Sequence, residues 1–281
     1  MQINPIIEKD LKTKMRGWKA PTLITFYLGF LGFLIWVFFI DNIYSAYNYF
    51  DPRLMTDVFK TIASFQFGLI VLITPVLTAT AISGEKERQT LDLLLCTDYS
   101  TFKIVIGKIV VSIAHVLLLI TASLPILSTV FLFGGIGIID MLRLFAFYLV
   151  TALLIASLGM LFSTIFRRSP VSIIVTYIMV LGLLYGTLIL HGLYLILYQN
   201  FTGQMPQAPL YWVLYTSPAF GFASVIGTDG GGIISVFLTG TAYGRVAAFG
   251  QISPWIINTA FSIVVSILII IFCAWKIKPV K

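Results

Sequence analysis

The residues best suited to chemistry in this chain are charged side chains that lie close together. Glu85, Lys86, Glu87, Arg88 and Asp92 fall within eight positions, in a chain of 281 residues of which only 10% are charged. Acidic and basic groups side by side form ion pairs, and such pairs fix the register of a contact with another protein. The composition of the patch therefore favours recognition.

A helix over this patch would separate an apolar face from a charged one. Glu85 and Arg88 form an i, i+3 pair on the charged face, and Gly84 breaks the apolar stretch that precedes them. The apolar stripe consists of Leu91, Leu94 and Leu95, at positions i, i+3 and i+4. A solvated loop would account for the charges alone. The leucine stripe favours a short amphipathic helix that docks onto a partner.

Signatures of the common enzyme classes are absent from the sequence. It contains no HExxH or G-x-S-x-G motif, no Cys/His cluster that could bind a metal, and no pair of carboxylates within an apolar stretch. The pair Gly107-Lys108 lacks the remaining residues of a phosphate-binding loop. His115 and His191 fall on different expected helices, where interhelical hydrogen bonds are favoured over a functional role. We expect no catalytic residue and no cofactor on this chain, so any ATP hydrolysis occurs on another polypeptide.

Composition places the chain in a membrane. The sequence is 59% hydrophobic and 15% aromatic, with a mean hydropathy of +1.00, which excludes an ordinary soluble domain. About 20 apolar residues span a bilayer as a helix, and continuous runs are unlike the alternation of a membrane β-barrel. Six such runs occur, at about 22–40, 61–82, 109–133, 144–166, 169–198 and 254–275. The sequence predicts an all-α membrane protein with six transmembrane helices in a single domain, 1–281.

The basic residues predict the orientation of these spans. If both termini are cytoplasmic, fourteen of the 18 Lys and Arg residues lie on the cytoplasmic side. The loop 83–103, between the second and third spans, is then cytoplasmic. This charge faces anionic lipid, so the net charge of +7 requires no nucleic-acid partner.

Three further segments carry expectations about their shape. Residues 1–21 form a cytoplasmic segment that is either an interfacial helix or a solvated basic tail. The run 169–198 is longer than a perpendicular span requires, so it is tilted, kinked or extends beyond the bilayer. Residues 199–253 contain several prolines and glycines, and we expect an extracytoplasmic cap between the fifth and sixth spans with broken or re-entrant helices.

The stretch ISGEKERQTLDLLLCTDYSTFKIVIGK resembles the cytoplasmic loop signature of ABC-2 type transporter permeases. That signature combines an acidic-basic-acidic triplet, a Thr-Leu-x-x-Leu-Leu run, a Thr-x-x-Ser turn and a Gly-Lys pair. The matching residues are Glu85, Lys86, Glu87, Thr90, Leu91, Leu94, Leu95, Thr97, Ser100, Gly107 and Lys108. The chain departs from the pattern at Gln89, where glycine is usual, and at Asp98, where proline is common. We expect neither departure to remove the helix.

The resemblance implies a permease subunit of an ABC exporter, working as two permease copies, identical or homologous, with two ATPase subunits that hold ATP and Mg. It implies a coupling helix between spans two and three that docks onto the ATPase, and a transport path lined mainly by the second and fifth spans. It also places the chain in a bacterial cell membrane. The expected ATPase-binding residues are Glu85, Lys86, Glu87, Arg88, Thr90, Leu91, Leu94 and Leu95.

Two other functions fit the same residues. A membrane scaffold could dock a cytoplasmic protein through the same helix without transporting anything, and an ion-coupled secondary carrier could have a similar set of spans. Carriers commonly bind the driving ion with a carboxylate at membrane depth, which disfavours that alternative here. The aromatic, uncharged spans favour an amphipathic or apolar substrate such as a peptide or drug.

Overall fold

The computed structural model describes residues 19–45, 52–91, 101–132, 137–203, 211–226 and 253–277. The described residues form helices and the turns between them, without a strand. The helices are α2 (Lys19–Ser45), α3 (Pro52–Thr78), α4 (Ser83–Glu87), α6 (Thr101–Ala122), α7 (Leu124–Leu132), α8 (Ile138–Ile165), α9 (Ser169–Leu181), the π-helical turn η1 (Gly182–Gly186), α10 (Thr187–Thr202), α11 (Tyr211–Tyr215), α12 (Pro218–Val225) and α14 (Pro254–Lys276).

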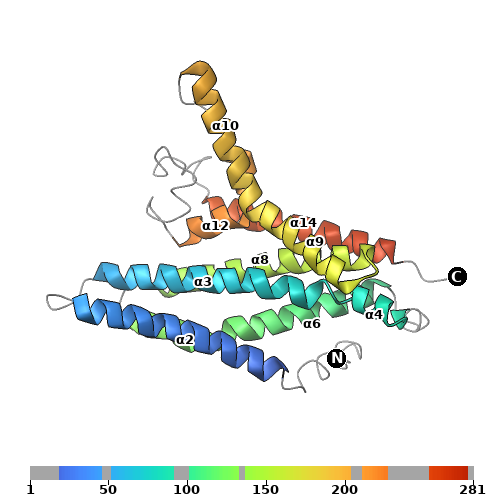
Figure 1. The fold of residues 1–281 in the computed structure, drawn as a ribbon, viewed down its shortest axis with the longest axis horizontal. Helices are drawn as coiled ribbons and strands as arrows, with labels where there is room; N and C mark the ends of the chain where they lie inside the picture. Colours follow the sequence, from blue (N-terminus) through green and yellow to red (C-terminus); the bar gives the residue numbers. More distant parts are fainter. Residues whose placement is uncertain are drawn as a thin grey trace.

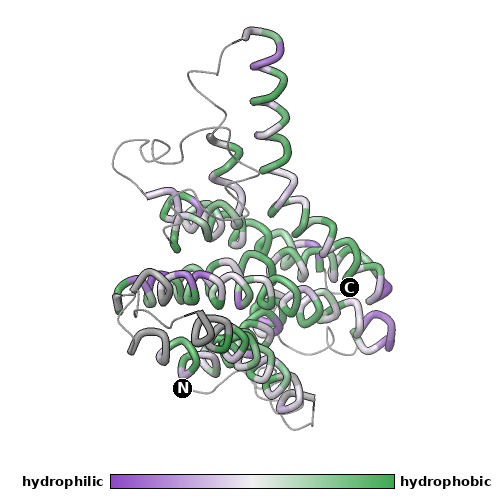
Figure 2. Tube along the Cα trace, turned by 60° about the vertical axis from the view of Figure 1, so that its left-hand side comes forward, coloured by the Kyte–Doolittle hydropathy of each residue, from purple (hydrophilic) through white to green (hydrophobic). Residues whose placement is uncertain are grey.

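Five helical stretches within the described residues are long and apolar enough to cross a membrane. They are 56–87, 101–128, 138–165, 169–202 and 254–276. The first expected span lies in α2, whose apolar described part, Ile24–Val37, is shorter than this criterion requires. The all-α membrane fold is therefore confirmed with five such helices, and a sixth span through α2 stays a prediction. Large apolar side chains are exposed along the bundle, as in a surface that faces lipid. Figure 2 shows that hydrophobic residues predominate along the helices.

Helix α8 is the centre of the bundle. It packs against α3, α6, α9, α12 and α14, and it is the most buried of the five long stretches. An aromatic cluster at the N-terminal half of α8 joins it to α3 and α12: the ring of Phe67 stacks on Phe222 with centroids 4.4 Å apart, and Phe147 lies beside both. The Tyr148 hydroxyl donates a hydrogen bond to the Ala63 carbonyl at 2.7 Å. These contacts fix α3 against α8.

Segments that the charge pattern assigns to the cytoplasm lie at one end of the bundle. Figure 1 shows the start of α2, helix α4, the start of α9 and the end of α14 at the same end. The ammonium of Lys86 lies close enough to Lys276 and Arg167 to interact with their charges. The segments that contain Lys86, Arg167 and Lys276 therefore lie close together, as expected if they are on the same side of the membrane.

The fifth long stretch is bent. Helix α9 runs along the bundle, η1 interrupts the regular hydrogen bonding, and α10 diverges from the other helices (Figure 1). Of the alternatives drawn from its length, a kink is confirmed. After it, α11 and α12 are two short helices separated at Ser217, and most of α12 is buried.

Candidate functional site

Helix α4 begins after a turn in which the preceding span ends. Helix α3 stops at Thr78, and residues 79–82 form the turn. The amides of Ile82 and Ser83 both donate to the Ser163 hydroxyl of α8, each at 2.8 Å. A hydroxyl that accepts from amides at a helix start satisfies donors that have no partner within the helix. The sequence prediction that Gly84 breaks this span is wrong, because the break lies earlier and Gly84 is inside α4.

Gly159 of α8 allows this turn to approach closely. A Cβ at Gly159 would lie 2.1 Å from the Thr78 Oγ1 and 2.9 Å from the Thr78 Cβ. No side chain larger than hydrogen fits at that distance without displacement. The absence of a side chain at Gly159 therefore sets how closely the end of α3 packs on α8.

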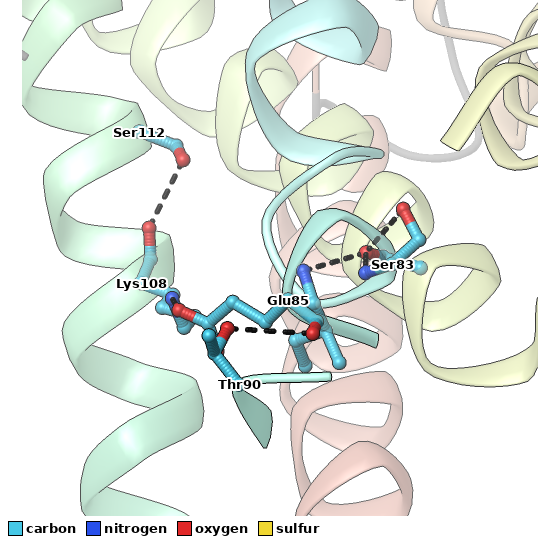
Figure 3. Close-up of polar contacts among 7 residues, drawn as sticks. Ser83, Glu85, Thr90, Lys108 and Ser112 are labelled. Carbon is cyan, nitrogen blue, oxygen red and sulfur yellow. Dashed lines mark hydrogen bonds and ion pairs between the residues drawn. The ribbon is translucent and has the colours of Figure 1, made fainter. Parts of the chain in front are cut away.

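Each charge of the acidic-basic-acidic triplet contacts a different long helix. Glu85 pairs with Lys108 of α6, with Oε1 and Nζ 2.6 Å apart (Figure 3). The Lys108 side chain is only 6% exposed and that of Glu85 is 23% exposed. A charge this buried is stable in the fold when an opposite charge compensates it. The pair therefore anchors α4 to α6.

Lys86 anchors α4 to α8. Its ammonium donates a hydrogen bond to the Thr164 carbonyl, in the last turn of α8. The carbonyls of a last turn have no partner within their helix and carry a partial negative charge, so a cation is favourable there. Lys86 is half-buried, which leaves little of it for a partner protein.

Glu87 anchors α4 to α9. Its carboxylate accepts hydrogen bonds from the Ser169 amide at 3.0 Å and from the Ser169 hydroxyl at 2.6 Å, at the first residue of α9. An acceptor at a helix N-terminus satisfies a free amide, and its negative charge is favourable there. A span needs only about 20 residues of the 32-residue stretch that α4 ends, and the charge pattern predicts that α4 lies on the cytoplasmic side, outside the hydrocarbon core. These hydrogen bonds lower the pKa of the Glu87 carboxyl, which keeps it charged.

Helix α4 ends in a Schellman turn. The Thr90 amide donates to the Glu85 carbonyl at 3.0 Å, the Gln89 amide donates to the Lys86 carbonyl at 3.2 Å, and Gln89 has a left-handed backbone with φ 57°. Glycine is the residue that adopts this conformation most easily. The departure from the family pattern at Gln89 therefore falls at a position where the backbone favours glycine.

Two expectations about this patch are wrong. The patch is not one helix that carries both faces, because α4 ends at Glu87 and a turn follows it. Glu85 forms its ion pair with Lys108 rather than with Arg88. Both errors have one cause. The predicted spacing of side chains presupposed a continuous helix through Gln89, but the backbone turns at that residue.

The expected docking residues separate into three groups. Glu85, Lys86 and Glu87 contact this chain's own helices, as described above. Arg88 and Thr90 are exposed. Leu91 is half-buried against the apolar cluster of Ile82, Val105, Ile109, Met160, Cys273 and Ile277. Leu94 and Leu95 lie outside the described residues. No measurement places a partner on any of these residues, so their docking role stays a prediction.

The sequence did not predict three residues that hold α4, namely Ser163, Thr164 and Ser169, and it indicated Lys108 only as part of the family pattern, without a contact to α4. Lys108 carried a usable signal, since a lysine followed directly by an uncharged run needs a partner. The hydroxyls carried none, because serine and threonine are common throughout the spans.

The remaining polar candidates do not form a second site. The Nδ1 of His115 donates to the Val111 carbonyl of its own helix at 3.0 Å, and no interhelical bond to His115 is observed among the described residues. His191 is buried on α10. Within the described ranges, no three His, Cys, Asp or Glu side chains gather where they could hold a metal ion.

Comparison with known families identifies the family of this chain. Residues 5–274 match the model of the family described as "ABC-2 family transporter protein". The match covers nearly the whole chain, from before α2 to within the last turn of α14. A search of curated proteins found no match.

Proposed function

The chain belongs to the ABC-2 transporter family, and from this premise we propose that it is the permease subunit of an exporter driven by ATP hydrolysis on a separate subunit. A membrane permease component of an ABC transporter follows from the family itself. The proposal adds the direction, the separate ATPase that carries ATP and Mg, and a complex of two permease copies with two ATPase copies. It also adds that the chain lies in a bacterial cell membrane with α4 on the cytoplasmic side. The proposed substrate is amphipathic or apolar.

The observation that carries the proposal is the attachment of α4 to three long helices. Glu85, Lys86 and Glu87 join α4 to α6, α8 and α9, while Arg88, Gln89 and Thr90 remain exposed beside it. A force applied by an ATPase to the exposed surface reaches the three helices through these contacts. Such an element changes the relative stability of two helix arrangements, which is how a partner drives a transport cycle.

The decisive experiment is purification of the tagged chain from its native membrane in mild detergent. We expect a nucleotide-binding subunit to copurify and its ATPase rate to depend on this chain. A scaffold that does not transport would bind a partner without altering an ATPase rate. A secondary carrier would purify without a nucleotide-binding subunit. Either result would overturn the proposal.

Glu87→Gln tests the role of α4 in coupling. Glutamine keeps the shape but loses the charge at the start of α9, so we expect the complex to assemble while stimulation of the ATPase falls. The matched control is Asp140→Asn, which removes the acid of the exposed Arg143–Asp140 pair at the start of α8. Equal stimulation in both variants and the wild type would contradict coupling through Glu87.

A labelling experiment tests the orientation. Thr90→Cys places a thiol on the exposed turn after α4, and Ile138→Cys places one on the exposed start of α8. In intact cells, an impermeant thiol reagent should modify the cysteine at 138 and leave the one at 90 unmodified until the cells are opened. The reverse pattern would contradict the proposed topology.

A further inference from the structure

The bend in the fifth long stretch occurs at a defined turn. Residues Gly182–Gly186 form η1, a π-helical turn between α9 and α10. A π turn closes its hydrogen bonds over one more residue than an α-helical turn, and such turns are a known cause of helix bends. Figure 1 shows α10 leaving the direction of the bundle beyond this turn. The bend therefore has an identifiable local origin.

Two glycines bound the turn, and packing requires neither of them. A Cβ built at Gly182 or Gly186 would meet no heavy atom within 4 Å. At Gly159 and Gly221 the same addition would come within 3 Å of neighbouring atoms. Glycine inside a helix is less stable than alanine because its backbone is freer. What Gly182 and Gly186 contribute is therefore backbone freedom at the bend.

A hydrogen bond from another segment reaches into the turn. The hydroxyl of Ser217, between α11 and α12, donates to the Leu184 carbonyl at 3.0 Å. Ser217 is fully buried and Leu184 is 3% exposed, so water does not compete for this bond. A side chain that bonds to a carbonyl within an irregular turn stabilises the bent conformation.

Asn258 of α14 holds Ser217 in place. Its amide nitrogen donates to the Tyr215 carbonyl at 2.8 Å and to the Ser217 carbonyl at 3.0 Å, and its side chain is buried. Gly221 provides the space, since a Cβ there would lie 2.7 Å from the Asn258 Oδ1. The turn is thus connected through Ser217 to α14, which packs on the central helix α8.

We propose that η1 is a hinge about which α10 moves relative to α9, and that Ser217 and Asn258 form a latch that holds the bent position. Helix α9 is fixed at its other end by Glu87, whereas, among the helices that the structure describes, α10 contacts mainly its neighbour η1 and the short helix α11. The hinge lets the outer half of this stretch move while the inner half stays with the bundle. It goes beyond the proposed function, because it is a property of the chain without an ATPase.

Electron spin distance measurements on the chain alone in lipid nanodiscs test the latch. Spin labels on cysteines at the exposed positions Leu193 of α10 and Ile267 of α14 report the separation of the two helices. Loss of one buried hydrogen bond corresponds to about a fivefold change in an equilibrium. We expect Ser217→Ala to increase, by about fivefold, the population of molecules whose spin-label distance differs from that of the bent conformation.

Ser266→Ala is the matched control, because Ser266 is equally buried but its hydroxyl bonds within its own helix, to Ser262. The same distribution in both serine variants would overturn the latch.

The double variant Gly182→Ala, Gly186→Ala tests the hinge. Neither methyl group meets a neighbouring atom, so the variant should fold, and alanine should narrow the distance distribution by stiffening the turn. Gly32→Ala in α2 is the control, since a Cβ there also meets nothing within 4 Å. Distributions of equal width in the double variant and the control would overturn the hinge. These outcomes are separate from the ATPase assay, so the hinge and the proposed function can fail independently.

Discussion

The strongest quantitative prediction concerns the Glu85–Lys108 ion pair. Glu85→Gln removes the opposite charge 2.6 Å from an ammonium that is only 6% exposed. Removing one partner of a buried pair costs about 3–5 kcal/mol, because the remaining ammonium loses its nearby opposite charge while it stays buried. Glu85 is 23% exposed, and water can reach part of the site, so the lower end applies. We expect Glu85→Gln to reduce the free energy of unfolding by about 3 kcal/mol.

Replacing Lys108 should reduce the free energy of unfolding by less than replacing Glu85. Lys108→Met leaves the carboxylate of Glu85, which is nearer to water, and a lost hydrogen bond to a charged group is worth about 2 kcal/mol. Replacing both charged groups leaves neither of them stranded. The double variant should therefore be less destabilised than the sum of the two single variants, with a coupling of about 2–3 kcal/mol.

Unfolding in mixed micelles, followed by fluorescence, measures all three variants against the wild type. Asp140→Asn is the control, because the Arg143–Asp140 pair is about half exposed and such pairs contribute about 0–1 kcal/mol. Destabilisation by Glu85→Gln no larger than that of this control would show that the ion pair does not stabilise the fold as a buried pair. Simple addition of the effects of the two single variants would show that Glu85 and Lys108 are not coupled.

Three further changes test other parts of the site. Gln89→Gly should stabilise the chain by about 0.5–1 kcal/mol in the same unfolding assay, because it relieves a left-handed residue; a loss of stability would contradict the Schellman turn. Gly159→Ala should destabilise it by about 1–3 kcal/mol through contact with Thr78, and an unchanged midpoint would show that the turn can move aside. Leu94→Ala should weaken assembly with the ATPase by about tenfold in a pull-down titration, and wild-type affinity would exclude this leucine from the docking surface.

The long helices could be predicted from the sequence because hydropathy over about 20 residues is a local property. The apolar stretches at 138–165 and 254–276 agree closely with the expected runs. Pro170 lies in the first turn of α9, a position that proline favours and that can be recognised from the sequence. The length of the apolar run that begins near Ser169 also indicated that this stretch is not a straight perpendicular span.

The contacts of the charged triplet could not be predicted in the same way. Ser169 is 82 positions from Glu87, and Lys108 is 23 positions from Glu85, so only the packing of the long helices brings them together. Periodicity also failed at Gln89, because a residue that is compatible with a helix occupies a left-handed position there. Likewise, Gly182 and Gly186 look like any other glycines until the space around them is known.

The three attachments of α4 have a mechanical consequence. Helix α4 has only five residues, which is too short to bend appreciably, so it behaves as a rigid link. A rigid helix that is bonded to three different helices cannot rotate or shift relative to them without breaking a contact. A load on its exposed end is then shared by α6, α8 and α9 at once. Loss of any one of these three contacts would let α4 move relative to the helix that it no longer contacts, and a displacement of α4 would then not reach that helix.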